Sequence, residues 1–335
     1  MKRRGWTVAV GAVLVAVLTW LVLRLEVPYV IFKPGPTEDV LGNYDGEPII
    51  RVDGAEETSS DGQLRLVTVS VYSDPTLLDV LYSWVIDDES VLPREFVYPP
   101  DRTEEEIEQE NAAQFTASQD SAETAALREL GCEVHVMVTG VREGSPAQEV
   151  LRAGDELLTV DDEAVTSVNR LRTLLETEPD RPHQIGYLRD GQEHIVEVTP
   201  GESTLLDLEL EQEQPCQYDV EFDISDIGGP SAGLMFALGI IDHVDPEDLT
   251  GGYVVAGTGE INDDGEVGPI GGIPQKLVGA RRDGATVFLT PEANCAEAVA
   301  NAVDGLMLVS VATLDDALDA LEDLREGRQP PLCAA

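Results

Sequence analysis

Gly228-Gly229-Pro230-Ser231-Ala232-Gly233-Leu234 is the stretch that decides the fold of the C-terminal part of this chain. An apolar run follows as far as about His243, which predicts a helix from Ser231 onward, and Pro230 suits its start because proline lacks an N–H that would be unpaired there. Glycine lets the backbone approach a substrate closely, and N–H groups at a helix start can stabilise an oxyanion. Two interpretations fit: a Gly-rich turn that caps a buried helix, or a loop that presents Ser231 as a nucleophile.

The lysines of the chain favour the second interpretation. Only Lys2, Lys33 and Lys276 are present, and Lys276 lies in a second Gly-Pro helix start, Gly271-Gly272-Ile273-Pro274-Gln275-Lys276-Leu277. Unlike arginine, lysine can act as a base when its pKa is lowered, and both a helix N-terminus and burial lower it. Ser231 and Lys276 are therefore predicted to be nucleophile and general base. The alternative for Lys276 is a solvated surface residue.

Three segments together resemble the proteolytic domain of the Lon family. They are Gly229-Pro230-Ser231-Ala232-Gly233, Gly257-Thr258-Gly259-Glu260-Ile261, and Gly268-Pro269-Ile270-Gly271-Gly272 ahead of Lys276. That family uses a Ser–Lys dyad, so the resemblance makes Ser231 the nucleophile, Lys276 the base and Thr258 the residue that supports the lysine. Gly228 departs from the pattern, because many ATP-dependent members have an acidic residue there. The resemblance covers roughly residues 205–326 and implies a serine peptidase domain whose relatives tend to form rings, so a homo-oligomer is expected.

The supporting residues of this site are expected to be Gly229, Pro230 and Ala232, whose backbone would surround the oxyanion. Gly229-x-Ser231-x-Gly233 also matches the nucleophile elbow of α/β-hydrolases, but that fold needs a histidine after the serine. Only His243 follows, about 18 Å away along the same predicted helix at 1.5 Å per residue. A Ser-His-Asp triad is therefore disfavoured.

No cofactor or metal is expected. The chain contains no Gly-x4-Gly-Lys-[Ser/Thr] phosphate loop, which argues against an ATP-driven module, and no His/Cys cluster has metal-ligand spacing. Asp263-Asp264 is interpreted as turn chemistry. The formal net charge of −44 and the pI of about 4.1 exclude a nucleic-acid-binding class, which needs basic patches. Such acidity also fits a saline environment.

The N-terminus predicts a membrane anchor. Lys2-Arg3-Arg4 precedes an apolar run from Gly5 to Leu23, long enough to span a bilayer, and the basic start predicts a cytoplasmic N-terminus. A cleaved signal peptide is the competing interpretation, without a convincing cleavage site. The expected localisation is a single-pass protein of the cell membrane with its catalytic part extracytoplasmic.

Residues 28–125 contain strands and helices with no chemistry of their own. We expect strands over Pro28–Phe32 and Gln63–Val71, a loop over Lys33–Thr37, and helices over Thr76–Ile86 and Glu104–Leu130. Together with the anchor, Pro34-Gly35-Pro36-Thr37, Tyr98-Pro99-Pro100 and Ser118-Gln119-Asp120 resemble a bacterial group of membrane-anchored, PDZ-containing Lon-like proteases. That resemblance spans nearly the whole chain.

Residues 126–200 are similar to the PDZ domains of bacterial proteases. The similarity rests on Gly144-Ser145-Pro146-Ala147 and on Leu151-Arg152-Ala153-Gly154-Asp155 ahead of a strand. PDZ domains add a peptide as an extra strand and hold its carboxylate in a backbone loop. By resemblance that loop would lie near Gly131, with Cys132 and Val134 as further peptide-binding residues. A small β domain that acts only as a spacer is the alternative.

The predicted fold class is α/β (α+β), in five parts: a cytoplasmic start and anchor (1–27), an N-terminal α/β segment (28–125), a PDZ-like domain (126–200), a Lon-type proteolytic domain (201–328) and a tail (329–335). Among three connectivities of four cysteines, Cys295–Cys333 with Cys132–Cys216 is favoured. The predicted function is an ATP-independent serine endopeptidase that acts on exported or unfolded protein or peptide substrates. A PDZ scaffold with an inactive Lon-like domain, and an esterase or amidase with the same dyad, are the alternatives.

Overall fold

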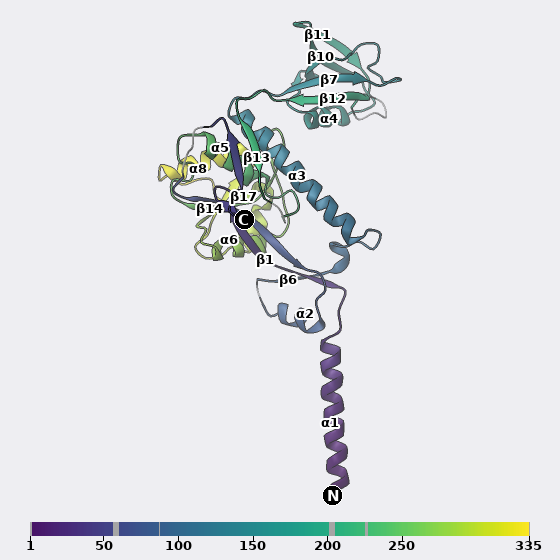
Figure 1. Ribbon diagram of the computed structural model, residues 1–335, viewed down its shortest axis with the longest axis vertical. Helices are drawn as coiled ribbons and strands as arrows, with labels where there is room; N and C mark the ends of the chain where they lie inside the picture. Colours follow the sequence, from purple (N-terminus) through teal and green to yellow (C-terminus); the bar gives the residue numbers. More distant parts are fainter. Residues whose placement is uncertain (1, 56–59, 87, 201–204, 225–226, 335) are drawn as a thin grey trace.

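The structure is a computed structural model that describes residues 2–55, 60–86, 88–200, 205–224 and 227–334. Helix α1 (Lys2–Leu23) extends from one end of a larger α/β body, and a smaller β domain lies at the opposite end (Figure 1). The long helix α3 (Glu104–Glu129) runs along the body and ends beside the β domain. A capping box at Thr103 and Glu106 starts this helix, in the way that Ser/Thr-x-x-Glu sequences satisfy the first backbone N–H groups.

A six-stranded sheet forms the centre of the α/β body, in the order β18-β17-β14-β5-β1-β6. The strands are β1 (Tyr29–Asp39), β5 (Gln63–Tyr72), β6 (Ser90–Pro93), β14 (Val254–Gly257), β17 (Val287–Pro291) and β18 (Met307–Val311). The pairs from β5 to β18 are parallel, whereas β1 is antiparallel to both of its neighbours. Strands from the expected N-terminal segment and the expected proteolytic domain therefore share one sheet.

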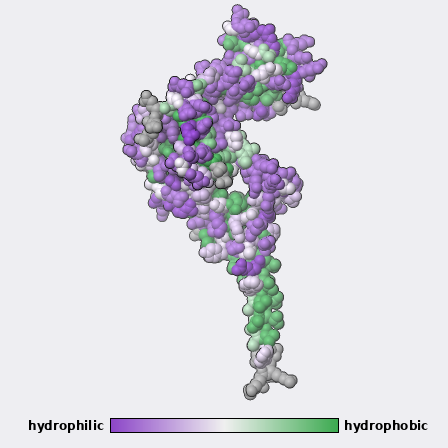
Figure 2. Space-filling view, in the orientation of Figure 1, coloured by the Kyte–Doolittle hydropathy of each residue, from purple (hydrophilic) through white to green (hydrophobic). Residues whose placement is uncertain are grey.

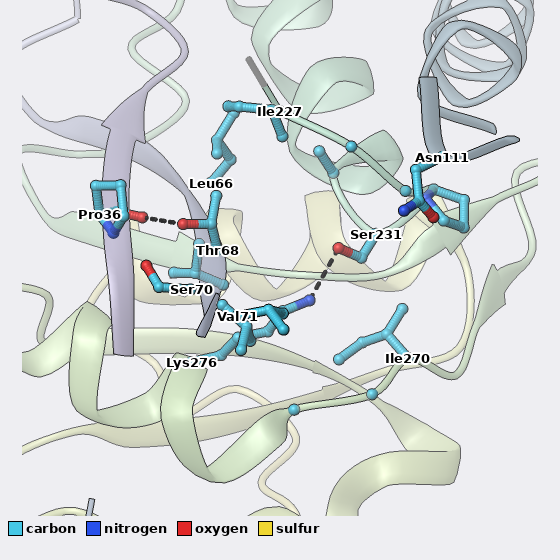
Figure 3. Close-up of a pocket in the computed structure, with 18 of the residues that line it drawn as sticks. Pro36, Leu66, Thr68, Ser70, Val71, Asn111, Ile227, Ser231, Ile270 and Lys276 are labelled. Atoms are coloured by element: carbon cyan, nitrogen blue, oxygen red, sulfur yellow. Dashed lines mark hydrogen bonds between the residues drawn. The ribbon is translucent and has the colours of Figure 1, made fainter. Parts of the chain in front are cut away.

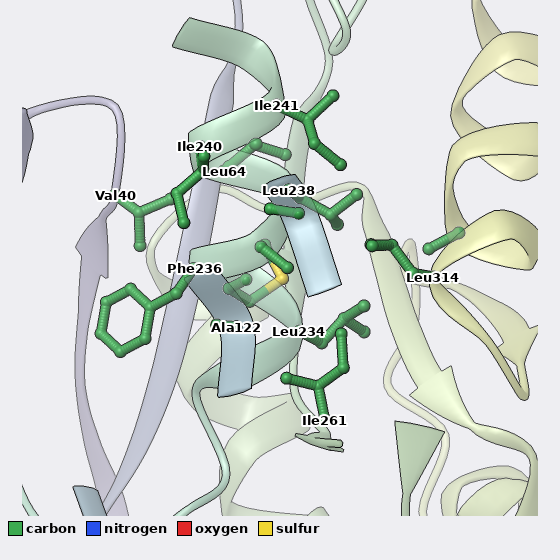
Figure 4. Packing of buried hydrophobic residues seen from close by; sticks show 14 of the residues in the cluster. Val40, Leu64, Ala122, Leu234, Phe236, Leu238, Ile240, Ile241, Ile261 and Leu314 are labelled. Carbon is green, nitrogen blue, oxygen red and sulfur yellow. The ribbon is translucent and has the colours of Figure 1, made fainter. Parts of the chain in front are cut away.

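Helices cover both faces of this sheet. Helices α3, α5 (Gly233–Val244) and α8 (Leu314–Arg325) contribute to the core on one face, and α6 (Ile273–Arg282) and α7 (Cys295–Ala300) lie on the other. Alternate strand residues point to opposite faces, so Val255 faces the first core and Ala256 the second. Figure 4 shows how α5 fills the first core with the side chains of Leu234, Phe236 and Leu238. Nearly the whole of α5 is buried, so the core fixes the position of the helix that follows the Ser231 turn.

The β domain is built on a second sheet in the order β11-β10-β8-β7-β12, with β9 paired to β8. Its elements are β7 (His135–Val141), β8 (Glu156–Val160), β9 (Glu163–Ala164), α4 (Val168–Glu176), β10 (His183–Arg189), β11 (Gln192–Val198) and β12 (Leu208–Glu213). A separate apolar core fills it. Strand β12 lies at the edge of this sheet, beside α4 (Figure 1). It comes after residue 200, where the PDZ-like domain was expected to end.

Short elements complete the body. They are β2 (Asn43–Tyr44), β3 (Glu47–Pro48), β4 (Ile50–Asp53), α2 (Leu77–Ser83), a 3-10 turn at Arg94–Phe96, β13 (Asp219–Phe222), β15 (Glu260–Ile261), β16 (Val267–Gly268) and a 3-10 turn at Glu292–Asn294. Strand β13 pairs with β4, and β15 pairs with β16.

The predicted loop over Lys33–Thr37 is wrong, because these residues belong to β1. The strand pairs with β5 on both sides of a register shift between Pro34 and Thr37. Its pairing with β6 covers only Tyr29 to Phe32, so the prolines occupy a bulged part of β1 with one free side, where a missing N–H breaks no ladder. Hydrogen-bonded turns occupy the stretch after Gly144.

The predicted transmembrane anchor is wrong as well. The side chains of α1 are largely apolar (Figure 2), but no helix in the described residues is long and apolar enough to cross a membrane. This finding overturns the predicted bilayer contact through residues 5–23 and the single-pass localisation, and leaves a mixed α/β fold.

Candidate active site

Ser231 lies in the turn between β13 and α5. The helix begins at Gly233, two residues later than the sequence predicted. The Ser231 carbonyl accepts hydrogen bonds from the Thr258 hydroxyl (2.9 Å) and from the Gly259 N–H (3.0 Å). The turn is therefore fastened to the segment that follows β14. Gly229 has a φ of +85°, in the left-handed region that favours glycine.

The last glycine of the motif is required by close packing. A Cβ at Gly233 would lie 2.7 Å from Ile261 Cγ2 and 2.8 Å from Ser118 Oγ. The first neighbour comes from β15 and the second from α3, so α5 can begin here only with a residue that has no side chain.

Helix α6 presents Lys276 to Ser231. Gly272 caps the helix with a φ of +75°, and Pro274 stands in the first turn, as predicted for a Gly-Pro helix start. Lys276 Nζ lies 2.9 Å from Ser231 Oγ and 2.9 Å from Thr258 Oγ1; Figure 3 shows the Lys276–Ser231 contact inside the pocket. The three residues predicted to form the site are therefore brought together by β14, the α5 turn and α6.

Burial sets the protonation of this lysine. Lys276 is 3% exposed, and desolvation lowers its pKa from 10.5 to about 7. In the described part of the chain, the Lys276 amine is hydrogen-bonded to two hydroxyl groups. A buried ammonium without a carboxylate partner favours the neutral amine. Near neutral pH a large fraction of the lysine is therefore an amine that can accept a proton from the Ser231 hydroxyl.

A cavity of about 1060 Å³ opens in front of the pair. Strand β5 supplies one wall through Leu66, Thr68 and Val71, and the Pro269–Gly272 segment supplies another. Figure 3 shows the side chains of Ser231 and Lys276 directed toward each other, and Asn111 of α3 also lines the cavity. The mixed apolar and polar walls and this volume suit a segment of polypeptide rather than a small ion.

Two family models match this chain. Residues 224–322 match the Lon protease (S16) C-terminal proteolytic domain, and residues 110–199 match the PDZ domain. The chain carries a Lon-type proteolytic domain and a PDZ domain. The first of these is a serine peptidase domain, and the motif residues that surround Ser231 and Lys276 lie within its matched range.

Curated relatives match about a third of this chain. The chain is 36% identical over 113 residues to Lon protease 2 of Bacillus subtilis (strain 168), which is 32% of this chain and 20% of that protein. It is 40% identical over 106 residues to the Lon protease of Haemophilus influenzae, 30% of this chain and 13% of that protein. The chain thus spans a fifth or less of these relatives' length. Among solved structures, the PDZ domain of an SdrC-like protein from Listeria monocytogenes is 22% identical over 22% of this chain and 85% of that one, with a TM-score of 0.20.

The residues predicted for the PDZ peptide site lie at a structural junction. Gly131 has a φ of +85° directly after α3, and Val134 packs against the PDZ core. Cys132 is disulfide-bonded to Cys216, and its carbonyl accepts a hydrogen bond from Gln214. These positions connect α3 to the β domain and precede the edge strand β12 by more than 70 residues in the sequence.

Both predicted disulfides are confirmed. Cys132 and Cys216 are bonded with their Cα atoms 5.4 Å apart, and Cys295 and Cys333 with theirs 5.0 Å apart. The first ties the two ends of the PDZ domain together where the chain enters and leaves it. The second holds the tail against β18, where the Cys333 N–H also donates to the Leu308 carbonyl.

The four histidines have partners elsewhere. His135 and His183 contact Glu156 and Asp161 in the PDZ domain, and His194 stacks on a tyrosine there. His243 Nδ1 lies 2.8 Å from the Gly239 carbonyl of its own helix. In the described part of the chain, none of these side chains is hydrogen-bonded to Ser231.

Sequence reasoning missed the role of Asp263 and Asp264. These residues form the turn between β15 and β16, which was interpreted only as turn chemistry. Asp263 accepts hydrogen bonds from Ser121 (2.8 Å) and from Asn169 at the start of α4 (3.1 Å). Asp264 accepts from Arg128 and from Thr166. The turn therefore fastens the PDZ domain to the proteolytic domain, and no local sequence signal distinguishes this contact from an ordinary Asp-Asp-Gly turn.

Proposed function

We propose that this chain is a serine endopeptidase that cleaves unfolded polypeptides through a Ser231–Lys276 dyad without ATP, and that its PDZ domain selects the substrate. The observation that carries the proposal is the 2.9 Å contact between Lys276 Nζ and Ser231 Oγ, two residues that line a large cavity. The lowered pKa of this buried lysine, about 7, matches the requirement that a general base titrate near the working pH.

Acylation follows from this geometry. The neutral Lys276 amine accepts the Ser231 hydroxyl proton as Oγ forms a bond to the peptide carbonyl carbon, and the carbonyl π electrons move to its oxygen. Collapse of this tetrahedral intermediate breaks the C–N bond. The Lys276 ammonium gives its proton to the departing amine, which leaves an ester on Ser231 and restores the neutral base.

Deacylation repeats the sequence with water. Lys276 accepts a water proton as the water oxygen attacks the ester carbonyl, and the intermediate releases a carboxylic acid while Ser231 regains its proton. Thr258 supports both steps, because its hydroxyl donates to the Ser231 carbonyl and also contacts Lys276 Nζ. With 0% of its surface exposed, Thr258 fixes the amine relative to the serine backbone.

The sequence contexts of the three lysines support independence from ATP. A phosphate-binding loop needs a lysine after a Gly-x4-Gly pattern, and neither Lys2, Lys33 nor Lys276 has that context. An unfolded chain needs no mechanical unfolding before it enters the cavity.

The edge strand β12 is the best-supported peptide site of the PDZ domain. It pairs antiparallel with β7 on one side, and α4 lies along it, with the Val168 N–H donating to Gln212 (3.1 Å). PDZ domains bind a peptide as an added strand on an exposed sheet edge. Glu209 and Glu211 alternate along β12, so a peptide with basic side chains is electrostatically favoured.

The test is digestion of a reduced, unfolded protein by the purified chain without ATP, beside Ser231→Ala and Lys276→Arg. The proposal predicts internal cleavage by the parent and loss of at least 1000-fold in both variants, because arginine keeps the charge but cannot act as a base. Cleavage by Lys276→Arg at the parental rate, or cleavage that requires ATP, would refute it.

A further inference from the structure

Helix α3 touches the nucleophile turn at two points. The Gly229 N–H donates to the Asn111 carbonyl (3.0 Å), and the Ser118 hydroxyl donates to the Pro230 carbonyl (2.9 Å). Ser118 belongs to the Ser118-Gln119-Asp120 motif and lies outside the region that matches the Lon-type proteolytic domain. The turn is thus held partly by a helix that the proteolytic-domain match does not include.

The Asn111 contact limits which backbone groups can bind an oxyanion. Because the Gly229 N–H already has a partner, it is not free for a substrate carbonyl. Among the described residues, no carbonyl is paired with the Ser231 N–H. In serine peptidases the N–H of the nucleophilic serine commonly belongs to the oxyanion hole.

Ser118 fixes the direction of that N–H. The Pro230 C=O and the Ser231 N–H belong to one planar peptide unit, and no peptide bond in the described residues is cis. In a trans unit the two groups point in opposite directions. A Pro230 carbonyl held toward α3 therefore turns the Ser231 N–H away from α3, on the turn where Ser231 lines the cavity.

The surroundings of Ser118 leave its hydroxyl little freedom. Ser118 is 4% exposed, and its Oγ lies 2.8 Å from the position that a Cβ would take at Gly233. A serine in mid-helix often bonds to the carbonyl one turn back, whereas this hydroxyl donates across to another segment. The hydrogen bond of the Ser118 hydroxyl therefore goes to the turn that carries Ser231.

We propose that Ser118 is a positioning residue for the peptidase reaction, whose hydroxyl orients the Pro230–Ser231 peptide unit so that the Ser231 N–H donates to the oxyanion. This inference rests on the proposed function. It implies that Ser118 contributes to binding of the tetrahedral intermediate and little to binding of the substrate.

The experiment compares Ser118→Ala with Ser121→Ala in the full chain. Ser121 is one turn further along α3 and donates a bond of similar length, 2.8 Å, to Asp263, so its variant controls for loss of a hydroxyl from the same helix. We would measure kcat and KM on a fluorogenic peptide, per active site titrated with an acylating reagent, and the affinity of a peptide aldehyde. The aldehyde forms a hemiacetal with a nucleophilic serine, whose oxygen mimics the oxyanion.

Complete loss of an oxyanion donor costs roughly 100- to 1000-fold in kcat. Misdirecting a donor that is still present should cost less, so we expect kcat to fall about 10-fold or more in Ser118→Ala and aldehyde affinity to fall in parallel. KM and the pH midpoint of kcat/KM should stay as in the parent, because Lys276 is untouched. Ser121→Ala should keep kcat within about twofold.

Two results would overturn the inference: equal kcat in the two variants, or a Ser118→Ala defect with changed KM or pH midpoint but no selective loss of aldehyde affinity. Partial unfolding of Ser118→Ala would not change the interpretation. Rates are expressed per titrated active site, and the ratio of aldehyde affinity to KM does not depend on the fraction of folded protein. An inactive parent, or an active Ser231→Ala, would instead refute the proposed function.

Discussion

The pH dependence of peptide cleavage gives a quantitative test of the lysine base. Below its pKa, Lys276 is an ammonium and cannot accept the serine proton, so kcat/KM should rise tenfold per pH unit and level off above the pKa. With a pKa of about 7, about half of the enzyme is competent at pH 7 and about a tenth at pH 6. An ordinary lysine, with a pKa near 10.5, would be neutral in only about one molecule in 3000 at pH 7.

The assay is kcat/KM on an uncharged fluorogenic peptide between pH 5 and pH 9.5, at constant ionic strength because the chain carries a formal net charge of −44. We expect a single rise with a midpoint near 7, reproduced in the rate at which an acylating reagent modifies Ser231. A rate that still climbs tenfold per unit at pH 9 would refute the reasoning that burial lowers this pKa. A profile that is flat across the range would refute lysine as the base.

Three further predictions concern stability. Because the pKa of Lys276 is lower in the folded chain than in the unfolded chain, folding stability is lost as pH falls from about 10.5 to about 7, by up to about 5 kcal/mol. In urea unfolding, the free energy of unfolding of Lys276→Met should therefore rise by several kcal/mol relative to that of the parent as pH falls from 10 to 6. A difference that stays constant over this range would contradict the prediction. Cys333→Ser opens a disulfide between residues 38 apart and should cost about 4 kcal/mol by the chain-entropy estimate, seen as a lower Tm under non-reducing conditions, whereas an unchanged Tm would argue against the bond. Gly233→Ala places a methyl 2.7 Å from Ile261 Cγ2 and should cost about 1–3 kcal/mol together with much of kcat; a parental free energy of unfolding would show that the turn tolerates a side chain.

The reacting residues could be predicted because their chemistry requires residue types and local motifs that can be recognised in the sequence. Lys276 stands out in a chain with only three lysines, and the Gly-Pro helix start around it follows from the φ of +75° at Gly272. Ser231 is marked by the small residues that its turn requires. The parallel strands and helices after residue 250 were also foreseeable, since each is a short apolar run with a clear boundary.

The contacts across long stretches of sequence could not be predicted in the same way. Strand β5 is separated from its parallel partner β14 by nearly two hundred residues, and nothing local records that pairing. The Ser118 bond to Pro230 joins positions 112 residues apart, and a serine in a helix reads locally as a weak helix former. The edge position of β12 depends on the order of five strands, which no local sequence signal records.

The expected membrane anchor failed for a different reason. Composition alone made the run from Gly5 to Leu23 a candidate span, because hydropathy is the main signal for such helices. In the part of the chain that the structure describes, no helix combines the length and the apolar character that crossing a membrane requires.

The measurement that tests the central claim most directly is the site of covalent acylation. The purified chain would be incubated with a slowly hydrolysed peptide ester and the adduct located by peptide mass spectrometry, in the parent and in Lys276→Met. We predict one acyl group on Ser231 in the parent and a rate of acylation at least 1000-fold lower in Lys276→Met. An adduct on another residue, or equal acylation of Ser231 in the variant, would contradict the Ser231–Lys276 dyad.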